Sequence, residues 1–267
     1  MFLISSFIDL KSTEAIIKHL LYITPQRNLL YVTDITNDVP SHTLEHLSCF
    51  LPGLFALGVN TLSGEELSQD VRELHLWAAK GLAETCWVTY ADTQTGLGPD
   101  EVRMNAWLDE EEWRARPKED RERLGMPGDV YIGGKWLAHV DKWKREGRVS
   151  GSPPGTRHQE REPDPQKRDW SLRIGKETYL LRPEASNFIG QYSPIQRRLT
   201  TSWQTIETFY ILWKVTGDTK WRERGWSIFE AIQEHAKTQY GYASVNFVDK
   251  TPPGLKDEMP SYFLAET

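Results

Sequence analysis

The chain has 267 residues, enough for one large domain or two small ones. Its formal net charge of -6 argues against a nucleic-acid-binding protein. No apolar run reaches the roughly 18 residues that a membrane span needs.

The N-terminal third is predicted to be helical. Apolar spacing predicts a first helix over Ser12–Tyr22. The residues before it lack a basic region and a small-residue cleavage site, so we expect no signal peptide. A second helix over Leu44–Leu57 is apolar nearly all round and is expected to be buried. A long third helix covers Gly64–Tyr90, with Ser63 as its N-cap.

Two cysteines, Cys49 and Cys86, fall in the second and third predicted helices. They are either two buried thiols or a disulfide that joins these helices. The disulfide would imply an oxidising compartment, and the count alone leaves both possibilities open.

The middle of the chain changes character. After a turn at Thr95–Pro99 and a short predicted strand at Glu101–Met104, residues 109–170 are rich in charge, Pro and Gly. We interpret 109–170 as a charged insertion within the domain. Its last part, Ser152–Arg168, is expected to be a loop whose charges face solvent. Four tryptophans are expected to hold the earlier part to the body: Trp107, Trp113, Trp136 and Trp143.

The C-terminal third again favours helices. Thr205–Thr216 and Thr219–Lys237 form a predicted helical hairpin with its turn at Gly217–Asp218. Gly241–Val248 alternates as a strand would. A further helix is predicted to start near Asp257, with a proline in its first turn.

The segment YLLRPE, Tyr179–Glu184, ends an apolar run on an arginine, a proline and a carboxylate. Arg182 can lie beside Glu184 and hold its negative charge, and the proline between them suits a first helical turn. The residues alone leave two interpretations open: a site carboxylate, or a glutamate that merely caps a helix.

Six motifs in this order resemble the class I α-1,2-mannosidases, glycoside hydrolase family 47. They are LEHLSCFLPGLFALG, TGLGPDEV, YLLRPE, TIETFYILWKVTGDTKWRERGW, GYASVNFV and DEMPSYFLAET. The long charged insertion resembles that of filamentous-fungal members. The resemblance covers nearly all of this chain but only about the C-terminal half of a family domain.

The resemblance implies an all-α fold, roughly the second half of an (α/α)7 barrel, with short β-hairpins. It implies inverting hydrolysis of α-1,2-linked mannose on high-mannose N-glycans, with a calcium ion, in the endoplasmic reticulum or Golgi. Inverting hydrolysis needs an acid and a base about 6.5–9.5 Å apart. The family's acid and a second essential Asp are expected upstream of Met1.

Residue by residue, Glu184 matches the family's general base, which Arg182 would keep ionised. Asp100 matches a second family carboxylate, usually Glu, and is the second predicted catalytic residue. Glu101 is the alternative because Asp is shorter. His46 matches a substrate-contacting histidine, with a satisfied core histidine as the competing interpretation.

Further matches concern calcium and the sugar ring. Glu207 and Glu266 match acids that hold waters around calcium, as Glu184 also could. Both Glu207 and Glu266 are also predicted, with Arg182, to bind substrate. Tyr262 stands where a phenylalanine usually stacks on the sugar, although a core aromatic would look the same. The family's direct calcium ligand, a threonine, is expected beyond Thr267, so no direct metal ligand is predicted. Cys49 and Cys86 match the family's disulfide.

Residues 185–204 interrupt the family motif, since removing them restores LLRPETIETFYILWK. Possible splice signals at both ends suggest a retained in-frame intron, and a true surface loop is the alternative. Three functions are therefore considered: an α-mannosidase, a mannose-recognising quality-control factor of the same superfamily, and the inactive product of a misread gene.

Overall fold

The structure, a computed structural model, describes residues 2–37, 39–106, 134–149, 151–181, 204–261 and 263. Within these ranges no helix is both long and apolar enough to cross a membrane. The α-helices are α1 (Phe2–His19), α2 (Leu51–Thr61), α3 (Gln69–Ala91), α6 (Trp136–Arg145), α7 (Gln204–Thr216) and α8 (Lys220–His235). Two 3-10 helices are η1 (His46–Phe50) and η2 (Pro165–Lys167).

The strands are short and antiparallel. They are β1 (Leu21–Ile23), β2 (Leu30–Val32), β3 (Ile35–Thr36), β4 (Val39–Pro40), β5 (Thr43–Glu45), β6 (Glu101–Met104) and β7 (Trp170–Leu172). β1 pairs with β2 and β3 with β4, and the third sheet has the order β5-β6-β7. The fold is therefore mainly helical with small sheets.

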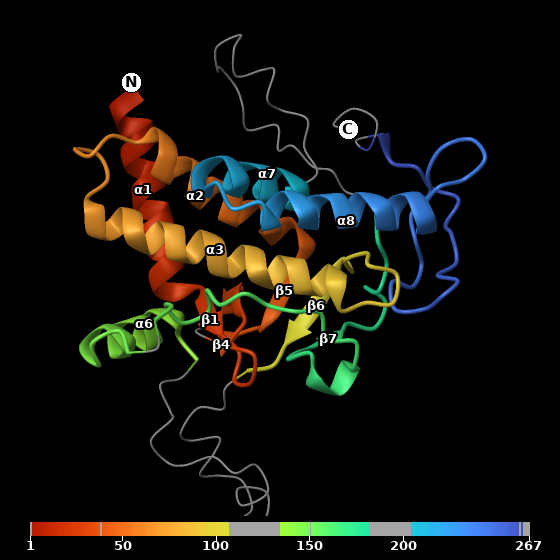
Figure 1. The fold of residues 1–267 in the computed structure, drawn as a ribbon, viewed down its shortest axis with the longest axis horizontal. Helices are drawn as coiled ribbons and strands as arrows, with labels where there is room; N and C mark the ends of the chain where they lie inside the picture. The colour runs from red at the N-terminus through yellow and green to blue at the C-terminus, as the bar shows by residue number, and fades with distance from the viewer. Residues whose placement is uncertain are drawn as a thin grey trace, which may run out of the picture.

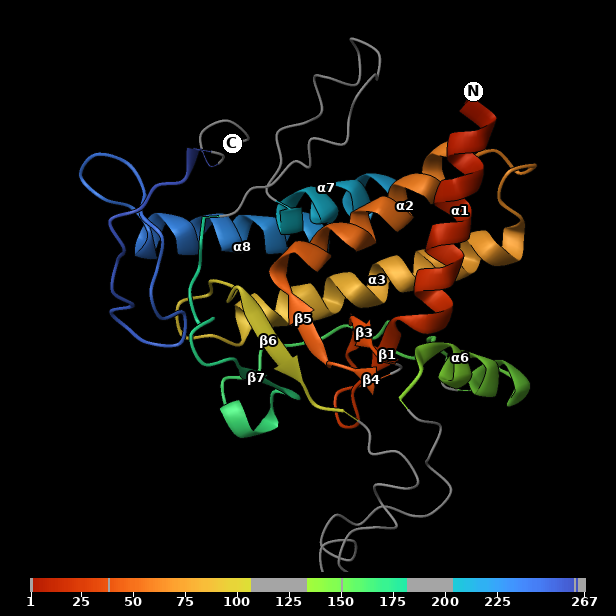
Figure 2. The same ribbon diagram turned by 180° about the vertical axis from the view of Figure 1, so that it is seen from behind.

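The helix α3 separates the helical layer from the sheets. In both views α2, α7 and α8 lie on one side of α3 and the sheets on the other (Figures 1 and 2). Within the pairs α2–α3 and α7–α8 the helices run in opposite directions (Figure 1). The helices α2 and α7 run in the same direction (Figure 1). The main core lies between these helices and includes Phe55, Leu82, Phe209, Trp221 and Ile232.

Small residues let other segments approach α3 closely. Ala78, Ala79 and Ala83 are completely buried. A Cβ added at Gly81 would lie 2.7 Å from a Leu30 side-chain carbon and 2.8 Å from the Gly155 carbonyl oxygen. Only glycine therefore allows β2 and the insertion to pack on this part of α3.

The predicted helical hairpin is confirmed, with α7 and α8 joined through Gly217 at φ +71°. The predicted strand at Glu101–Met104 is also confirmed as β6. The first predicted helix is confirmed only in part. It extends from Phe2 to His19, and Leu21–Ile23 is a strand instead.

The prediction of a buried helix over Leu44–Leu57 was wrong in two ways. The segment begins as β5 and η1, and α2 starts only at Leu51. Its apolar residues are also not all buried, since Leu54 and Leu57 are each 44% exposed. An apolar run shows neither the period of a helix nor which of its faces finds a partner.

Ser63 caps a separate turn and not α3. Its hydroxyl accepts from the Glu66 N–H, and a Glu66 carboxylate oxygen accepts from the Ser63 N–H at 3.0 Å. This reciprocal pair is a capping box, but α3 begins only at Gln69. Gly241–Val248 likewise forms only isolated bridges in place of the expected strand.

The insertion is anchored more firmly than the sequence suggested. Trp136 and Trp143 are buried as expected, whereas Trp107 and Trp113 lie outside the described residues. Although most side chains of Ser152–Arg168 face solvent, Gln159 and Arg168 are buried. The view of this segment as a solvated loop was therefore wrong at its anchor points.

One anchor is a buried ion cluster between α3, α8 and the insertion. Glu84 accepts from Arg224 Nη2 and from the Gln159 N–H, both at 2.8 Å. Lys220 Nζ lies 3.2 Å from the same carboxylate. The guanidinium of Arg224 also lies over the rings of Trp87 and Trp221. Each buried charge is thus paired, as burial requires.

A second anchor lies at the C-terminal end of α3. Asp92 is fully buried and accepts from Arg27 Nη1 at 2.6 Å, the Glu162 N–H at 2.7 Å and Trp170 Nε1 at 3.1 Å. Burial raises the pKa of Asp92, and these hydrogen bonds oppose the rise. The insertion and β7 are therefore held to α3 by one carboxylate.

His75 makes stability depend on pH. It lies on α3, 2% exposed, with its ring 5.2 Å from that of Phe55 on α2, and burial lowers its pKa to about 4. Between the ordinary value of 6.5 and about 4, only the unfolded chain binds the proton, so stability falls as pH falls through this window. We expect this residue to remove roughly 2 kcal/mol between pH 7 and pH 4.5.

The measurement is urea unfolding of the unmodified chain and of His75→Leu at both pH values. The variant should lose roughly 2 kcal/mol less than the unmodified chain over this interval. Equal losses in the two proteins would show that His75 does not carry this dependence.

Candidate functional site

A narrow hollow, with no room for a water molecule in this structure, lies where β5 passes into η1. It is lined by His46, Gly98, Asp100, Thr178, Tyr179 and Leu180. Three separate segments thus meet here: the η1 start, the stretch before β6, and the YLLRPE segment. Two of the predicted site residues, His46 and Asp100, share this hollow.

Asp100 is held by its own backbone between two neighbours. Its N–H donates to the Thr178 carbonyl, and its carbonyl accepts from the His46 N–H, both at 2.9 Å. Its side chain is 8% exposed, and Lys176 Nζ lies 3.4 Å from the carboxylate. The Asp100 carboxylate is therefore fixed at the hollow beside a cation.

Glu101, the alternative to Asp100, has different partners. Its carboxylate pairs with Lys176 at 2.5 Å and with Arg173. These cations, Lys176 foremost, lower the pKa of Glu101. Asp100 lines the hollow, whereas Glu101 does not.

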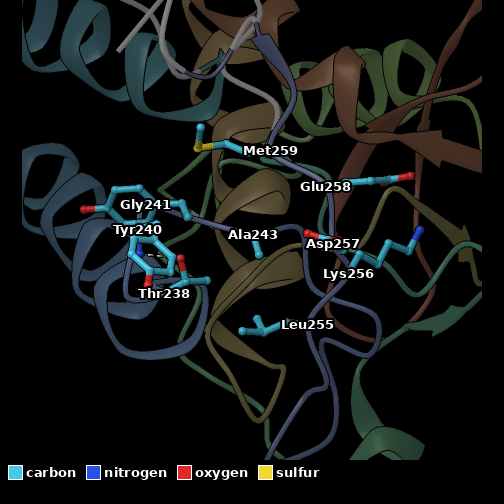
Figure 3. A pocket seen from close by; sticks show the side chains of 10 residues that line it. Thr238, Tyr240, Gly241, Ala243, Leu255, Lys256, Asp257, Glu258 and Met259 are labelled. Atoms are coloured by element: carbon cyan, nitrogen blue, oxygen red, sulfur yellow. Dashed lines mark hydrogen bonds between the residues drawn. The ribbon is translucent and has the colours of Figure 1, made fainter.

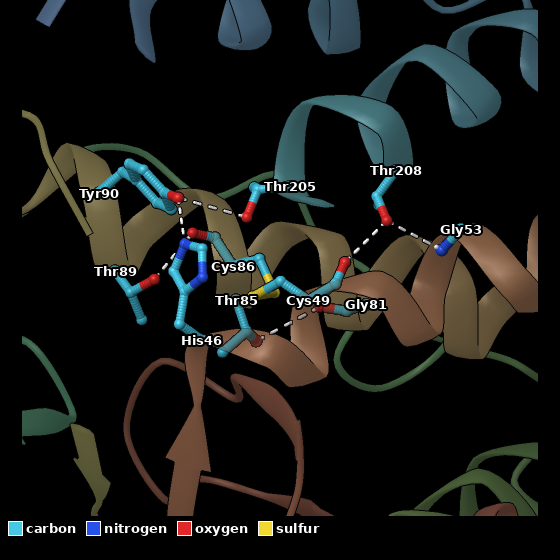
Figure 4. The surroundings of a disulfide bond; sticks show 10 residues. All are labelled: His46, Cys49, Gly53, Gly81, Thr85, Cys86, Thr89, Tyr90, Thr205 and Thr208. Carbon is cyan, nitrogen blue, oxygen red and sulfur yellow. Dashed lines mark hydrogen bonds between the residues drawn. A yellow bond between two sulfur atoms is a disulfide. The ribbon is translucent and has the colours of Figure 1, made fainter. Parts of the chain in front are cut away.

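His46 is connected to α3 and α7 through one phenol. Its Nε2 hydrogen-bonds to the Tyr90 hydroxyl, which lies 3.4 Å from Thr205 Oγ1 (Figure 4). All three side chains are at most 7% exposed. A Cβ at Gly98 would lie 2.6 Å from the Tyr90 ring, so a glycine is needed where this ring packs.

Thr208 of α7 joins the junction of η1 and α2. Its hydroxyl donates to the Cys49 carbonyl at 2.7 Å and accepts from the Gly53 N–H at 3.1 Å. The Gly53 N–H lies in the first turn of α2 and has no partner within its own helix. Thr208 thus supplies an N-terminal cap from a different helix (Figure 4).

Cys49 and Cys86 form a disulfide, with their Cα atoms 5.8 Å apart. It joins η1, which starts at His46, to α3, four residues before Tyr90 (Figure 4). The predicted disulfide is confirmed. The bond keeps the turn that carries His46 close to the part of α3 that carries Tyr90.

The YLLRPE segment is described as far as Leu181. Tyr179 exchanges two backbone hydrogen bonds with Val245, at 2.9 and 2.8 Å. Leu181 is fully buried and has φ 50°, a left-handed conformation that is strained for a residue with a Cβ. The backbone is thus forced into an unusual direction immediately before Arg182.

The other predicted residues are distributed as follows. Glu207 lies half-buried in the first turn of α7, two residues after Thr205. Arg182, Glu184, Tyr262 and Glu266 lie outside the described residues, and so does the segment 185–204. Their roles and the retained intron stay predictions.

A second, more open hollow of about 480 Å³ lies beside the C-terminal end of α8 (Figure 3). It includes Thr238, Tyr240, Gly241 and the run Leu255–Met259. None of the predicted site residues lines it. Among the described residues, no three His, Cys, Asp or Glu side chains are grouped so that they could hold a metal ion.

The sequence reasoning missed Tyr90, Thr205 and Thr208. Tyr90 follows Cys86 by four residues and so lies on the same face of α3. That spacing, combined with the disulfide, could have placed Tyr90 near η1. The partners of Thr205 and Thr208 lie 115 and 155 residues away, and no local pattern indicates them.

Residues 9–267 match the model of Glycosyl hydrolase family 47. The chain belongs to this family. Among curated relatives, mannosyl-oligosaccharide alpha-1,2-mannosidase IA of Drosophila melanogaster is 26% identical over 91% of this chain and 24% of its own length. The endoplasmic reticulum mannosyl-oligosaccharide 1,2-alpha-mannosidase of Mus musculus is 26% identical over 96% of this chain and 27% of its own length.

Among solved structures, the alpha-1,2-mannosidase from Trichoderma reesei matches with a TM-score of 0.57 and 20% identity. The match covers 96% of this chain and 38% of that one, and it concerns the fold alone. This family 47 chain spans about a quarter of the length of the curated relatives named above.

Removing the disulfide should destabilise this family 47 chain. The bond closes a loop of 37 residues, which predicts a loss of about 3–4 kcal/mol in Cys49→Ala/Cys86→Ala through the entropy of the unfolded chain. Chemical denaturation of the variant and of the unmodified chain measures the difference. The unmodified chain under a reductant should fall to the level of the variant. An unchanged midpoint in both would contradict the role given to this bond.

Proposed function

We propose that this chain carries part of the active site of an inverting α-1,2-mannosidase that trims high-mannose N-glycans. The main support is the convergence of His46, Asp100 and the YLLRPE segment on one hollow, in a chain of family 47. The two relatives named above carry α-1,2-mannosidase names, which favours this activity.

We infer that α2, α3, α7 and α8 are two successive helix pairs of an (α/α)7 barrel, roughly its second half. Their alternating directions support this arrangement (Figure 2). In such a barrel η1 and the start of α7 lie at the same end of neighbouring helices. The bond between Thr208 and Cys49 is consistent with that placement.

In the proposed reaction Glu184 takes a proton from the water that attacks the anomeric carbon, and Arg182 keeps Glu184 ionised. His46 and Asp100 bind hydroxyl groups of the sugar, and Tyr262 stacks on its ring. The leaving oxygen needs a proton from a second carboxyl group. Asp100 and Glu101 both pair with Lys176, which disfavours either as that acid.

We propose that the carboxylates of this chain contact a calcium ion only through water molecules. Glu207 is the described member of the predicted set, together with Glu184 and Glu266. Calcium prefers hard oxygen ligands and often retains waters, which suits carboxylates in this role. The described residues do not form a complete set of ligands, so no catalytic step is assigned to the ion.

We place the protein in the secretory pathway, in the endoplasmic reticulum or Golgi. The disulfide supports an oxidising compartment. The alternative, a mannose-recognising quality-control factor, is less favoured because the relatives named above are mannosidases.

The test is an assay of α-1,2-mannobiose hydrolysis, followed by ¹H NMR. It uses this chain and a longer polypeptide that extends it in both directions of its gene. The longer polypeptide should cleave α-1,2- but not α-1,6-linked mannobiose and should release β-mannose first. Glu184→Gln should lower kcat by about 100- to 10,000-fold.

Glu177→Gln is the matched control, since Glu177 lies seven residues before Glu184. Within the described part of the chain only its backbone carbonyl forms a hydrogen bond, which it accepts from the Val248 N–H at 3.1 Å. This variant should keep the unmodified rate. Initial release of α-mannose, full activity of Glu184→Gln, or no cleavage by the longer polypeptide would each refute the proposal.

A further inference from the structure

Tyr90 packs against two of the residues that line the hollow, His46 and Tyr179. It comes from the C-terminal part of α3 and is 2% exposed. Its ring packs against His46, with centroids 5.6 Å apart, and against Tyr179, with centroids 6.3 Å apart. One buried phenol therefore contacts the start of η1 and the YLLRPE segment.

The hydroxyl of Tyr90 has two hydrogen-bond partners but only one hydrogen to donate. One partner is His46 Nε2, and the other is Thr205 Oγ1 at 3.4 Å. Burial raises the pKa of Tyr90 well above its usual value, so the phenol keeps its proton. The direction of this short chain of hydrogen bonds then determines which nitrogen of His46 carries hydrogen.

Acidity decides between the two directions. A phenol is a stronger acid than an aliphatic alcohol, and an imidazole nitrogen is a stronger acceptor than a hydroxyl oxygen. The best pairing gives the phenol hydrogen to His46 Nε2 and lets the Thr205 hydroxyl donate to the phenol oxygen. In a neutral imidazole this arrangement places the hydrogen of His46 on Nδ1.

We propose that Tyr90 is a positioning residue for His46. It fixes the Nδ1–H tautomer and the ring orientation of His46, and its second, more distant partner is Thr205 in the first turn of α7. This proposal rests on the proposed function for the role of His46 as a sugar-binding residue. The hydrogen-bond arrangement itself does not depend on catalysis.

The first experiment is ¹⁵N NMR of the imidazole groups in the full unmodified chain at neutral pH. The ¹⁵N shifts and ¹⁵N–¹H couplings of His46 should show hydrogen on Nδ1 and a hydrogen-bonded, hydrogen-free Nε2. In Tyr90→Phe, which keeps the ring, the Nε2 signal should lose this hydrogen-bonded shift. Thr205→Val removes only the more distant hydroxyl and should leave the tautomer unchanged.

Tyr31→Phe is the matched control because Tyr31 is also a buried tyrosine, with its hydroxyl 2.7 Å from His42 Nδ1. It should change the signals of His42 and leave those of His46 as they are. Hydrogen on Nε2 of His46 in the unmodified chain would overturn the proposal. Identical His46 spectra in Tyr90→Phe and the unmodified chain would also overturn it.

Kinetics separate this proposal from the proposed function. In the active longer polypeptide, Tyr90→Phe should raise KM for α-1,2-mannobiose about tenfold and change kcat less, as expected for a loss of binding. If His46 carries hydrogen on Nδ1 but the longer polypeptide hydrolyses no mannobiose, the proposed function fails and the role of Tyr90 stands. If the longer polypeptide hydrolyses mannobiose but His46 carries hydrogen on Nε2, the role of Tyr90 fails and the proposed function stands.

Discussion

The site depends on how the short helix η1 is held between α3 and α7. The Cys49–Cys86 disulfide joins η1 to α3, and Thr208 of α7 binds the Cys49 carbonyl and the Gly53 N–H. The covalent bond and the two hydrogen bonds act on neighbouring residues of one turn. Together they fix where His46 lies relative to Asp100, and hence the shape of the hollow.

Buried charges position the remainder of the described chain. Glu84 lies on α3 and binds the Arg224 guanidinium and the Gln159 N–H. Asp92 follows α3 directly and binds the Arg27 guanidinium and the Glu162 N–H. A buried carboxylate without such partners would cost several kcal/mol. The described segment that contains Gln159 and Glu162 is therefore part of the folded body, and it is attached to α3.

Periodic helices were predictable from the sequence, because their apolar spacing reflects one buried face, as in α7 and α8. The disulfide was predictable only through the family resemblance. The strand and 3-10 turn at Thr43–Phe50 were not, since a continuous apolar run fits several structures. The partners of Glu84 were also hidden, because they lie 75 and 140 residues away in sequence.

His46 and Asp100 line one hollow in the structure, and their roles in a site stay predictions. The link through Tyr90 depends on side-chain packing that no sequence pattern encodes. The most direct test of the account is ¹H–¹⁵N NMR of the chain titrated with α-1,2-mannobiose. We predict saturable shifts at His46, Asp100 and Thr178–Leu180 and none around the open hollow at Leu255–Met259. Shifts confined to that second hollow, or no saturable shifts, would contradict it.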